Sequence, residues 1–427
     1  MSTGAELHAL VAELFPLCRS ITGDGVRATL GIVGERIPLD VHEVPTGTQV
    51  LDWTVPREWN VRDAYVADAA GRRVIDFRAH NLHLLGYSVP LRARMTLEEL
   101  RPHLHTLPEQ PDRIPYRTSY YAEQWGFCLE HARLGELREG EEYEVVIDAT
   151  LEDGSLTYGE CVLPGHEAAE VLVSAHVCHP SLCNDNLSGI AVATHLARAL
   201  SERERRHTYR FVFAPGTIGA ITWLARNEAA AARVAHGLVL TGVGDPGPPT
   251  YKRSRRGDAT IDRAMAHVLG EGGAEHRLQD FSPWGYDERQ YGSPGFDLPV
   301  GCLMRTPHGT YPEYHTSGDD LGFVTPEALA ATRDRCLAAV DVLERDATYR
   351  NLSPKGEPQL GRRGLYGALG GSADKRAEEM AMLWVLNFSD GEHSLLGIAE
   401  RSGLPFRTVA HAAELLLEHE LLERLAP

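Results

Sequence analysis

The sequence lacks the segments that mark membrane or secreted proteins. No apolar run approaches the ~20 residues that a transmembrane helix needs, and residues 1–10 show no basic segment followed by an apolar one, as a signal peptide would. The seven cysteines are an odd number spread over 427 residues, which is not the pattern of a disulfide framework. We therefore expect a cytoplasmic protein with no membrane partner.

Positive charge is also scarce. The chain has 42 Lys and Arg against 60 Asp and Glu, a formal net charge of −18. Nucleic-acid binding depends on neutralising phosphates with Lys and Arg, so we expect no nucleic-acid partner. Hydrophobic residues make up 43% of the sequence, which is enough for a folded core, and the length predicts two or three domains.

Hydrophobic patterns divide the chain into regions. Apolar residues recur at helical spacing in most of residues 1–40, and short β-type runs separated by Pro, Gly and Asn follow to about residue 160. Beyond that point, apolar runs typical of fully buried strands alternate with helical segments, which predicts an α/β layer with crossovers. The predicted strands are 171–175, 209–214 and 237–241, and the predicted helices are 189–200 and 217–232.

The C-terminal region has a pattern of its own. Residues 354–374 are rich in Gly and Pro and predict a linker, and helical segments at 394–401 and 405–418 flank a short turn, as in a helix-turn-helix. Residues 375–427 hold five Lys or Arg and nine Asp or Glu, a net charge of −4. We therefore predict an interaction or oligomerisation module rather than a DNA-binding one, and we expect a homo-oligomer.

Two motifs carry candidate metal ligands. His176 ends a predicted buried strand, and Asp185 stands at the start of the following helix. Ligands of open α/β sheets gather at the carboxyl ends of the strands, and zinc accepts imidazole and carboxylate. The alternative is that Asp185 or Asn186 only caps the helix. The second motif is Glu313-Tyr314-His315-Thr316-Ser317, whose alternative is a solvated acidic turn.

Taken together, the motifs resemble those of the co-catalytic zinc aminopeptidases, in which a strand-end His, an Asn-Asp-Asn-x-x-Gly loop and a late Tyr-His-Thr supply ligands. The chain resembles more closely a bacterial family of aminopeptidase-like proteins with a small inserted domain and a C-terminal winged helix. The shared phrases include Arg19-Ser20-Ile21-Thr22-Gly23, Glu43-Val44-Pro45-Thr46-Gly47-Thr48, Asp52-Trp53, Tyr116-Arg117-Thr118-Ser119-Tyr120-Tyr121 and Trp125-Gly126-Phe127-Cys128.

The resemblance implies a three-layer α/β domain of the zinc-exopeptidase type with a β-rich insert and a C-terminal winged helix. The boundaries that we predict are 1–55 and 150–350 for the aminopeptidase-like domain, 56–149 for the insert and 372–427 for the winged helix. The implied metal ligands are His176, Asp185 and His315. Two imidazoles and one carboxylate are typical of a mononuclear catalytic zinc, so we expect one Zn²⁺ per chain.

The departures from the two-metal pattern concern carboxylates. Thr241 stands where the pattern has an Asp, and Pro215-Gly216-Thr217 stands where it has paired glutamates, one a metal ligand and the other the base. The closer family keeps one Glu in this motif, at the position of Gly216. A positioned general base is worth ~10²–10⁴ in rate, so its loss bears directly on hydrolysis. If the base is simply missing, a Gly216→Glu change should raise the rate.

Other groups near the motifs are candidates for catalysis and substrate binding. Glu313 lies two residues before His315, and in an extended segment both side chains would share a face. Glu313 is therefore a candidate base, or a carboxylate that orients a ligand imidazole. We assign Asp287 to the catalytic site as well. The candidate substrate-binding residues are Tyr286, Arg289 and Arg305.

Three functions remain open at this point. The first is a zinc-dependent amide hydrolase acting on a small peptide or aminoacyl compound, in a specialised biosynthetic pathway. The second is acyl or amide transfer without attack by water, since glutaminyl-cyclase-like enzymes run intramolecular aminolysis on a related fold. The third is a non-catalytic scaffold, which the losses at Gly216 and Thr241 favour. Structural zinc is usually closed by four ligands, which favours an enzyme here.

Overall fold

The computed structural model of the chain describes residues 2–365 and 373–425. Within these residues, no helix combines the length and the apolar character needed to cross a membrane. Contacts group the chain into two compact units, Met1–Gly257 with Arg277–Arg333, and Asp258–His276 with Asp334–Pro427. The domain boundaries expected from the sequence stay a prediction, and residues 372, 426 and 427 of the expected winged helix lie outside the described residues.

The first unit is built on an eight-stranded mixed sheet of order β1-β10-β12-β11-β13-β16-β14-β15. Strands β12, β11, β13 and β16 are parallel, which agrees with the predicted α/β layer. Every residue of β11 is buried, so its apolar run covers both faces of the sheet. The strands are β1 (Asp40–Pro45), β10 (Ser155–Leu163), β11 (Glu170–His176), β12 (Thr208–Ala214), β13 (Val234–Leu240), β14 (Thr250–Lys252), β15 (Arg277–Gln279) and β16 (Val300–Met304).

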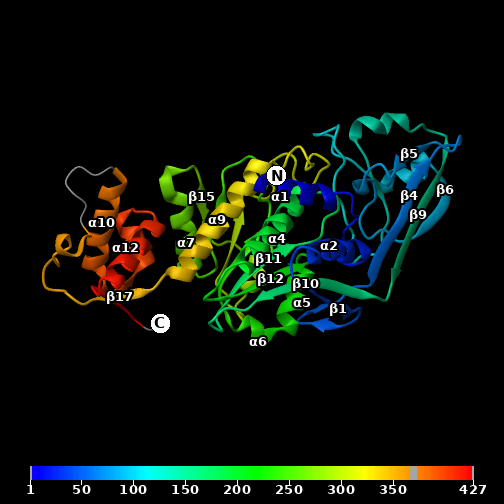
Figure 1. Ribbon diagram of the computed structural model, residues 1–427. Helices are drawn as coiled ribbons and strands as arrows, with labels where there is room; N and C mark the ends of the chain where they lie inside the picture. The colour runs from blue at the N-terminus through cyan, green and yellow to red at the C-terminus, as the bar shows by residue number, and fades with distance from the viewer. Residues whose placement is uncertain (1, 366–372, 426–427) are drawn as a thin grey trace. The chain divides into compact units, whose positions relative to one another are not determined.

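The order of the strands places a ligand site at β11. The chain passes from β11 to its neighbour β12, and then crosses back to β13 on the other side of β11. Right-handed crossovers in opposite directions put the connecting helices α4 (Ser188–Ser201) and α5 (Ile218–Arg226) on opposite faces, as Figure 1 shows. Sites in such sheets form where the direction reverses, here at the carboxyl end of β11, where His176 lies.

Further helices complete the first unit. The helix expected over 217–232 is interrupted at Asn227, where the backbone leaves the helical region and the side-chain amide donates to the carbonyl of Trp223. The remaining helices are α1 (Thr3–Leu14), α2 (Asp24–Gly34), α6 (Glu228–Ala231), α8 (Glu288–Tyr291) and the first part of α9 (Pro326–Arg345).

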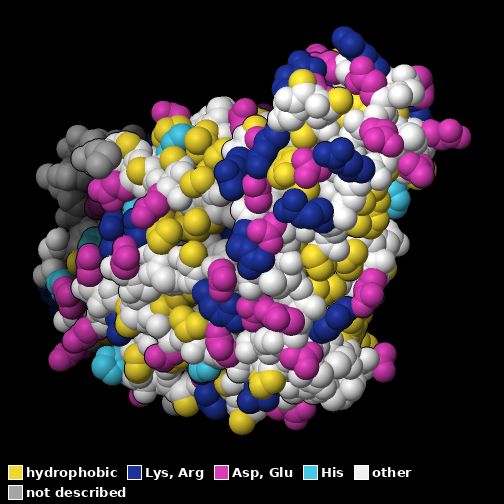
Figure 2. Space-filling model, turned by 90° about the vertical axis from the view of Figure 1, so that its right-hand side faces the viewer, with side chains coloured by type: hydrophobic (Ala, Val, Ile, Leu, Met, Phe, Trp, Pro, Cys, Tyr) yellow, Lys and Arg dark blue, Asp and Glu magenta, His cyan; other side chains and the backbone are white. Residues whose placement is uncertain are grey.

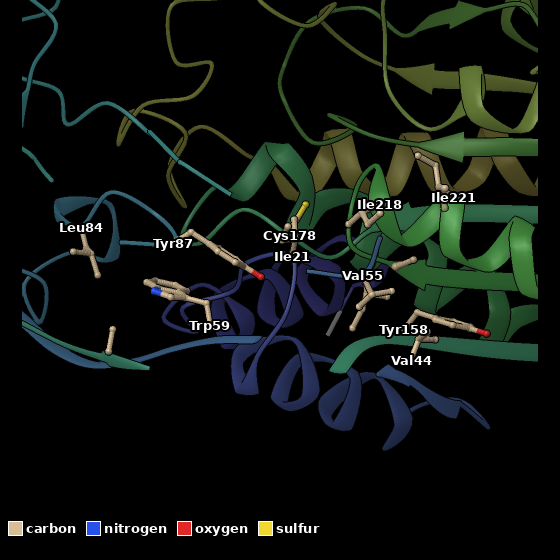
Figure 3. Packing of buried hydrophobic residues seen from close by; sticks show 14 of the residues in the cluster. Ile21, Val44, Val55, Trp59, Leu84, Tyr87, Tyr158, Cys178, Ile218 and Ile221 are labelled. Atoms are coloured by element: carbon tan, nitrogen blue, oxygen red, sulfur yellow. The ribbon is translucent and has the colours of Figure 1, made fainter. Parts of the chain in front are cut away.

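The predicted β-rich insert contains a four-stranded antiparallel sheet of order β5-β4-β9-β6. Its core is continuous with that of the main sheet, because Trp59 and Tyr87 pack in one cluster with Ile21, Cys178 and Ile218 (Figure 3). The elements of this region are β2 (Gln49–Val50), β3 (Trp53–Thr54), β4 (Glu58–Ala67), β5 (Arg73–Asp76), η1 (Asn81–His83), β6 (Leu91–Thr96), α3 (Leu97–Leu100), η2 (Arg101–His103), β7 (Leu104–His105), β8 (Phe127–Cys128), η3 (His131–Glu136) and β9 (Glu142–Glu152).

The second unit contains the predicted helix-turn-helix. Ser394 accepts a hydrogen bond from the backbone of Gly397 and so caps α11, and Gly403 ends that helix in the left-handed region with φ 70°. A three-stranded sheet of order β18-β17-β19 accompanies the helices. The elements are α7 (Thr260–Gly270), η5 (Glu271–Gly273), the end of α9, β17 (Thr348–Asn351), η6 (Gly361–Arg363), α10 (Ala373–Phe388), β18 (Asp390–Ser394), α11 (Leu395–Ser402), α12 (Phe406–Glu418) and β19 (Leu422–Arg424).

Candidate metal centre

The structure brings the three ligands predicted from the sequence together around the carboxylate of Asp185. His176 Nε2 lies 2.9 Å from Asp185 Oδ1, and His315 Nε2 lies 3.1 Å from Asp185 Oδ2. Asp185 is 1% exposed and stands in the turn η4 (Cys183–Leu187), between β11 and α4. The two histidines therefore approach different oxygens of one buried carboxylate, from segments more than a hundred residues apart.

A third imidazole faces the same carboxylate. His179 Nε2 lies 3.8 Å from Asp185 Oδ2, and the donor atoms of His176, His179 and Asp185 all lie within 4.8 Å of one another. His179 is not among the metal ligands expected from the sequence. The signal that could have found it is the His-x-x-His spacing directly after a buried strand.

Backbone hydrogen bonds fix the loop that carries Asp185. The Asp319 carboxylate accepts from the backbone nitrogens of Asn184, at 2.6 Å, and Asp185, at 2.9 Å. The Asn186 side chain accepts from the backbone nitrogen of Gly189 at 3.2 Å, a bond of the helix-capping type. Of the two residues that could cap the helix according to the sequence, Asn186 makes the capping bond. The Asp185 carboxylate is left to face the histidines.

The amide of Asn186 also orients the first histidine. Its nitrogen donates to the carbonyl of Leu240 at 2.9 Å and lies 3.2 Å from His176 Nδ1. Its oxygen accepts from the backbone nitrogens of Gly189 and Gly242, both at 3.2 Å. Contacts on both sides of the amide hold it in one orientation, and the His176 ring is thereby held with Nε2 towards Asp185.

His315 is held in an unusual backbone conformation. Its φ is 54°, in the left-handed region that residues with a Cβ seldom adopt. The backbone nitrogen of Tyr116 donates to the His315 carbonyl at 2.8 Å, and the Tyr314 ring stacks on the imidazole with centroids 4.0 Å apart. Such strain persists only where surrounding contacts maintain it, as they do here.

The charges of the cluster fit a divalent cation. Burial opposes the charge of Asp185, but the surrounding His179, His176 and His315 hold its pKa well below the usual value. Burial lowers the pKa of His176, and it lowers the pKa of His179 to about 3. At neutral pH the ionised carboxylate of Asp185 therefore faces the uncharged imidazoles of His176 and His179, which are donors that zinc accepts.

The corner at Gly216 is filled by an aromatic ring. A Cβ added at Gly216 would lie 2.2 to 2.5 Å from the ring and hydroxyl atoms of Tyr286. That ring stacks on His176 with centroids 3.8 Å apart, and its hydroxyl lies 3.5 Å from Cys178 Sγ. The gain in rate expected of a Gly216→Glu change stays a prediction. The place of the missing side chain is occupied, and a glutamate would have to displace Tyr286.

A buried ion pair holds the backbone of Tyr286 in place. Lys252 Nζ lies 2.8 Å from Glu288 Oε1, and both side chains are almost fully buried. The same carboxylate accepts from the backbone nitrogen of Tyr286 at 3.0 Å, and Lys252 also donates to the carbonyl of Trp284. Glu288 was expected from the sequence, with His179 and His308, as a candidate replacement for the base or as a partner that orients a ligand, whereas nothing in the sequence singled out Lys252. A lysine in the short strand β14 gave no pattern that could have paired it with a residue 36 positions away.

Glu313 lies outside any extended segment, whereas the expectation that it shares a face with His315 depended on extended backbone. It stands in a turn, where its carboxylate accepts from Arg113 at 2.9 Å. The ion pair with Arg113 holds this carboxylate in place, so the structure favours a positioning role over that of a base.

Asp287 is buried, and its Oδ1 has no hydrogen-bond partner. Burial and the neighbouring Glu288 raise its pKa well above the usual value. Other buried polar atoms in the described part of the first unit also lack a hydrogen-bond partner, among them Thr241 Oγ1, His179 Nδ1 and both ring nitrogens of His308. Buried polar groups are normally paired, so these atoms are candidates for contacts with a bound ligand.

The two candidate arginines are half-buried. Arg305 follows β16 and donates to the carbonyl of Ala328 at 3.4 Å, and burial lowers its pKa. Arg289 lies in α8 and donates to the carbonyl of Pro283 at 3.4 Å. Neither guanidinium is paired with a carboxylate in these contacts, so their role as substrate-binding groups stays a prediction.

Comparison with known proteins agrees with this architecture. The model of a family described as "Domain of unknown function (DUF4910)" matches residues 8–346, and a winged helix-turn-helix model matches residues 347–424. A Clostridium acetobutylicum protein with the provisional name polysaccharide biosynthesis protein with aminopeptidase-like domain is 53% identical over 421 residues. The match covers 99% of this chain and 96% of that protein.

Solved structures confirm the predicted fold class. A crystal structure from Clostridium acetobutylicum, provisionally designated a peptidase, matches with a TM-score of 0.95 and 51% identity over 99% of this chain and 97% of that one. A zinc aminopeptidase from Bacillus subtilis matches with a TM-score of 0.56 and 14% identity over 79% and 94% of the two chains, which shows a common fold. The chain belongs to the DUF4910 family, an aminopeptidase-like α/β fold followed by a C-terminal winged helix.

Proposed function

We propose that the protein is a zinc-dependent, aminopeptidase-like amide hydrolase that acts on a small peptide or aminoacyl compound. The observation that carries this proposal is the buried Asp185 carboxylate with His176 and His315 on its two oxygens. These three groups would hold one zinc ion per chain. In the structure His315 stands outside the group formed by His176, His179 and Asp185, whose donor atoms lie within 4.8 Å of one another, so the His315 ring would have to move toward the ion. The provisional name of the Clostridium relative supports a place in a biosynthetic pathway.

The bound zinc would supply Lewis acidity at the carbonyl of the scissile amide. Burial of His176 and Asp185 keeps bulk water away from that carbonyl. The pKa of Tyr286 is raised well above its usual value by burial and by the nearby Cys178 and Asp185, so its hydroxyl donates hydrogen bonds and does not act as a base. The protonated carboxyl of Asp287 is our candidate for delivering a proton to the leaving amine.

Substrate recognition is assigned to groups around this centre. Arg305 and Arg289 would contact a substrate carboxylate, and the Tyr286 ring would pack against the substrate. Trp284 is 75% exposed beside Tyr286 and offers an aromatic surface of the kind that binds apolar parts of ligands. We further propose that the protein is cytoplasmic and forms a homo-oligomer, with neither nucleic acid nor membrane as a partner.

Acyl transfer is the second candidate. It is favoured by one observation, the Tyr286 ring in the corner where the related pattern has a glutamate base. A site without that base suits attack by an amine, supplied by the substrate itself or by a second molecule, because an amine is more nucleophilic than water and needs less assistance. The two reactions share the metal centre and differ only in the attacking group.

The test is a product analysis with chromogenic aminoacyl amides. The zinc-loaded protein should release the amine and the free amino acid, and both chelation and His315→Ala should abolish the release. Release of the amine with a new amide, formed only when a second amine is supplied, would replace hydrolysis by transfer. A protein that binds zinc but turns over neither type of substrate would favour the non-catalytic scaffold.

A further inference from the structure

His179 lies where a bound ion would meet a third imidazole. Its Nε2 approaches Asp185 Oδ2 to 3.8 Å, the same oxygen that His315 Nε2 approaches to 3.1 Å. The rings of His179 and His315 have centroids 5.0 Å apart. Donor atoms of a tetrahedral zinc at ~2.0–2.1 Å lie about 3.3 Å from one another, so only a small movement would bring His179 into contact with the ion.

The fold holds His179 in this position against its own backbone preference. Its φ is 77°, and the buried guanidinium of Arg19 donates to its carbonyl at 3.2 Å. Arg19 is itself anchored by a second bond, to the carbonyl of Leu14 at 2.6 Å. The Tyr116 ring packs on the imidazole with centroids 4.7 Å apart. Strained backbone that is maintained by buried contacts is a feature of functional sites.

One nitrogen of the His179 imidazole is left without a hydrogen bond among the described residues. His179 is 6% exposed, and its Nδ1 has no hydrogen-bond partner among the described residues. A structural histidine at this depth would normally have both nitrogens satisfied. Its Nε2 faces the carboxylate at a distance that is too long for a good hydrogen bond but close to that between two ligands of one metal.

We propose that His179 is a ligand of the metal and supplies the donor that the pattern of the two-metal relatives takes from a glutamate at position 216. This inference rests on the metal site of the proposed function. Gly216 offers no side chain and Tyr286 fills its corner, so the replacement comes from a different loop. A neutral imidazole in place of a carboxylate leaves the ion with more positive charge, and a more strongly charged ion polarises a carbonyl more strongly.

The test measures zinc affinity by competition with a chelating dye, with Co²⁺ absorption as a second readout. The variant is His179→Asn, because asparagine tolerates the left-handed backbone but cannot reach Asp185. We expect the affinity to fall by at least the ~10–100-fold that loss of an outer contact costs, and the Co²⁺ bands to shift. His195→Ala, which removes a buried histidine on α4, should change neither readout.

The outcomes separate this inference from the proposed function. Circular dichroism must first show that His179→Asn is folded. If the native protein binds zinc and His179→Asn binds it equally well with unchanged Co²⁺ bands, His179 is not a ligand, and the proposed function is untouched. If affinity falls but no amide is cleaved, His179 is a ligand and hydrolysis is wrong. A native protein that binds no metal would overturn both.

Discussion

Single residues decide what chemistry remains at this site. Gly216 and Tyr286 form a complementary pair, because the ring of one fills the volume that a side chain on the other would need. The same ring stacks on His176, so the pair also limits the movement of a candidate ligand. A glutamate at position 216 would therefore require the Tyr286 ring to move.

A double-mutant cycle tests this pair. Gly216→Ala should destabilise the protein by about 1–3 kcal/mol, because the new methyl overlaps the Tyr286 ring. In a Tyr286→Ala background the same change should cost much less, with an interaction energy of roughly 0.5–3 kcal/mol by urea unfolding. Gly31→Ala is the control, since nothing lies within 4 Å of its added Cβ and the helix α2 should gain slightly. Additive effects would contradict the overlap.

At the scale of elements, one arginine ties three segments near the start of the insert. Arg27 of α2 makes two hydrogen bonds to Glu58 of β4, at 2.8 and 2.6 Å, and one to Glu43 of β1 at 2.7 Å. Glu58 also accepts from the backbone nitrogen of Ser155, the first residue of β10, at 2.8 Å. The long strands β4 and β10 are thereby joined at one point to the helix that packs on β10.

The Glu58 pair predicts a dependence of stability on pH. Arg27 lowers the pKa of Glu58 from 4.5 to about 2. A carboxyl whose pKa is lower in the folded state stabilises fully above its unfolded value, and this contribution disappears as the pH falls through the folded value. Glu58→Gln should therefore cost about 1–2 kcal/mol at pH 7, and the difference from the native protein should shrink between about pH 5 and pH 2.

The measurement is urea unfolding of both proteins across that pH range. Glu43→Gln is the matched control, since Glu43 meets the same arginine with a side chain that is 48% exposed. It should cost less than Glu58→Gln at pH 7. A constant difference between native protein and Glu58→Gln from pH 7 to pH 2 would show that the charge of Glu58 contributes nothing.

At the scale of the whole molecule, acidic residues outnumber basic ones by 60 to 42. On the face shown in Figure 2, Lys and Arg side chains lie among Asp and Glu, without a continuous basic area. The net charge of −18 argues against a surface that binds nucleic acid, and the absence of a nucleic-acid partner stays a prediction. The winged helix is then expected to bind protein, as its own negative charge also indicates.

Zinc should stabilise the molecule through the first unit alone. At 100 times its dissociation constant, a ligand of the folded state contributes about 2.7 kcal/mol, which corresponds to a rise in Tm on the order of 5 °C. Calorimetry of chelator-treated protein with and without zinc should show this rise, and both His176→Ala and His315→Ala should lose it. An equal rise in these variants would place the zinc elsewhere.

The sequence by itself determined the α/β class, the β-rich insert, the helix-turn-helix and the histidines His176 and His315 with Asp185 as neighbours. Periodicity and strand-end position report local structure and the edge of a sheet, which is why these features could be predicted. The resemblance to a family supplied the rest of that assignment, since no spacing within one segment can pair His315 with residues 130 positions earlier.

Only the tertiary structure decided which groups surround the carboxylate of Asp185. His179, the Tyr286 ring over Gly216, and the Lys252–Glu288 pair come from different loops, and their contacts depend on how those loops pack. The turn at Glu313 likewise contradicted the expectation that Glu313 lies in an extended segment and shares a face with His315. Side-chain directions in loops follow from packing and backbone strain, and neither of these leaves a periodic trace in the sequence.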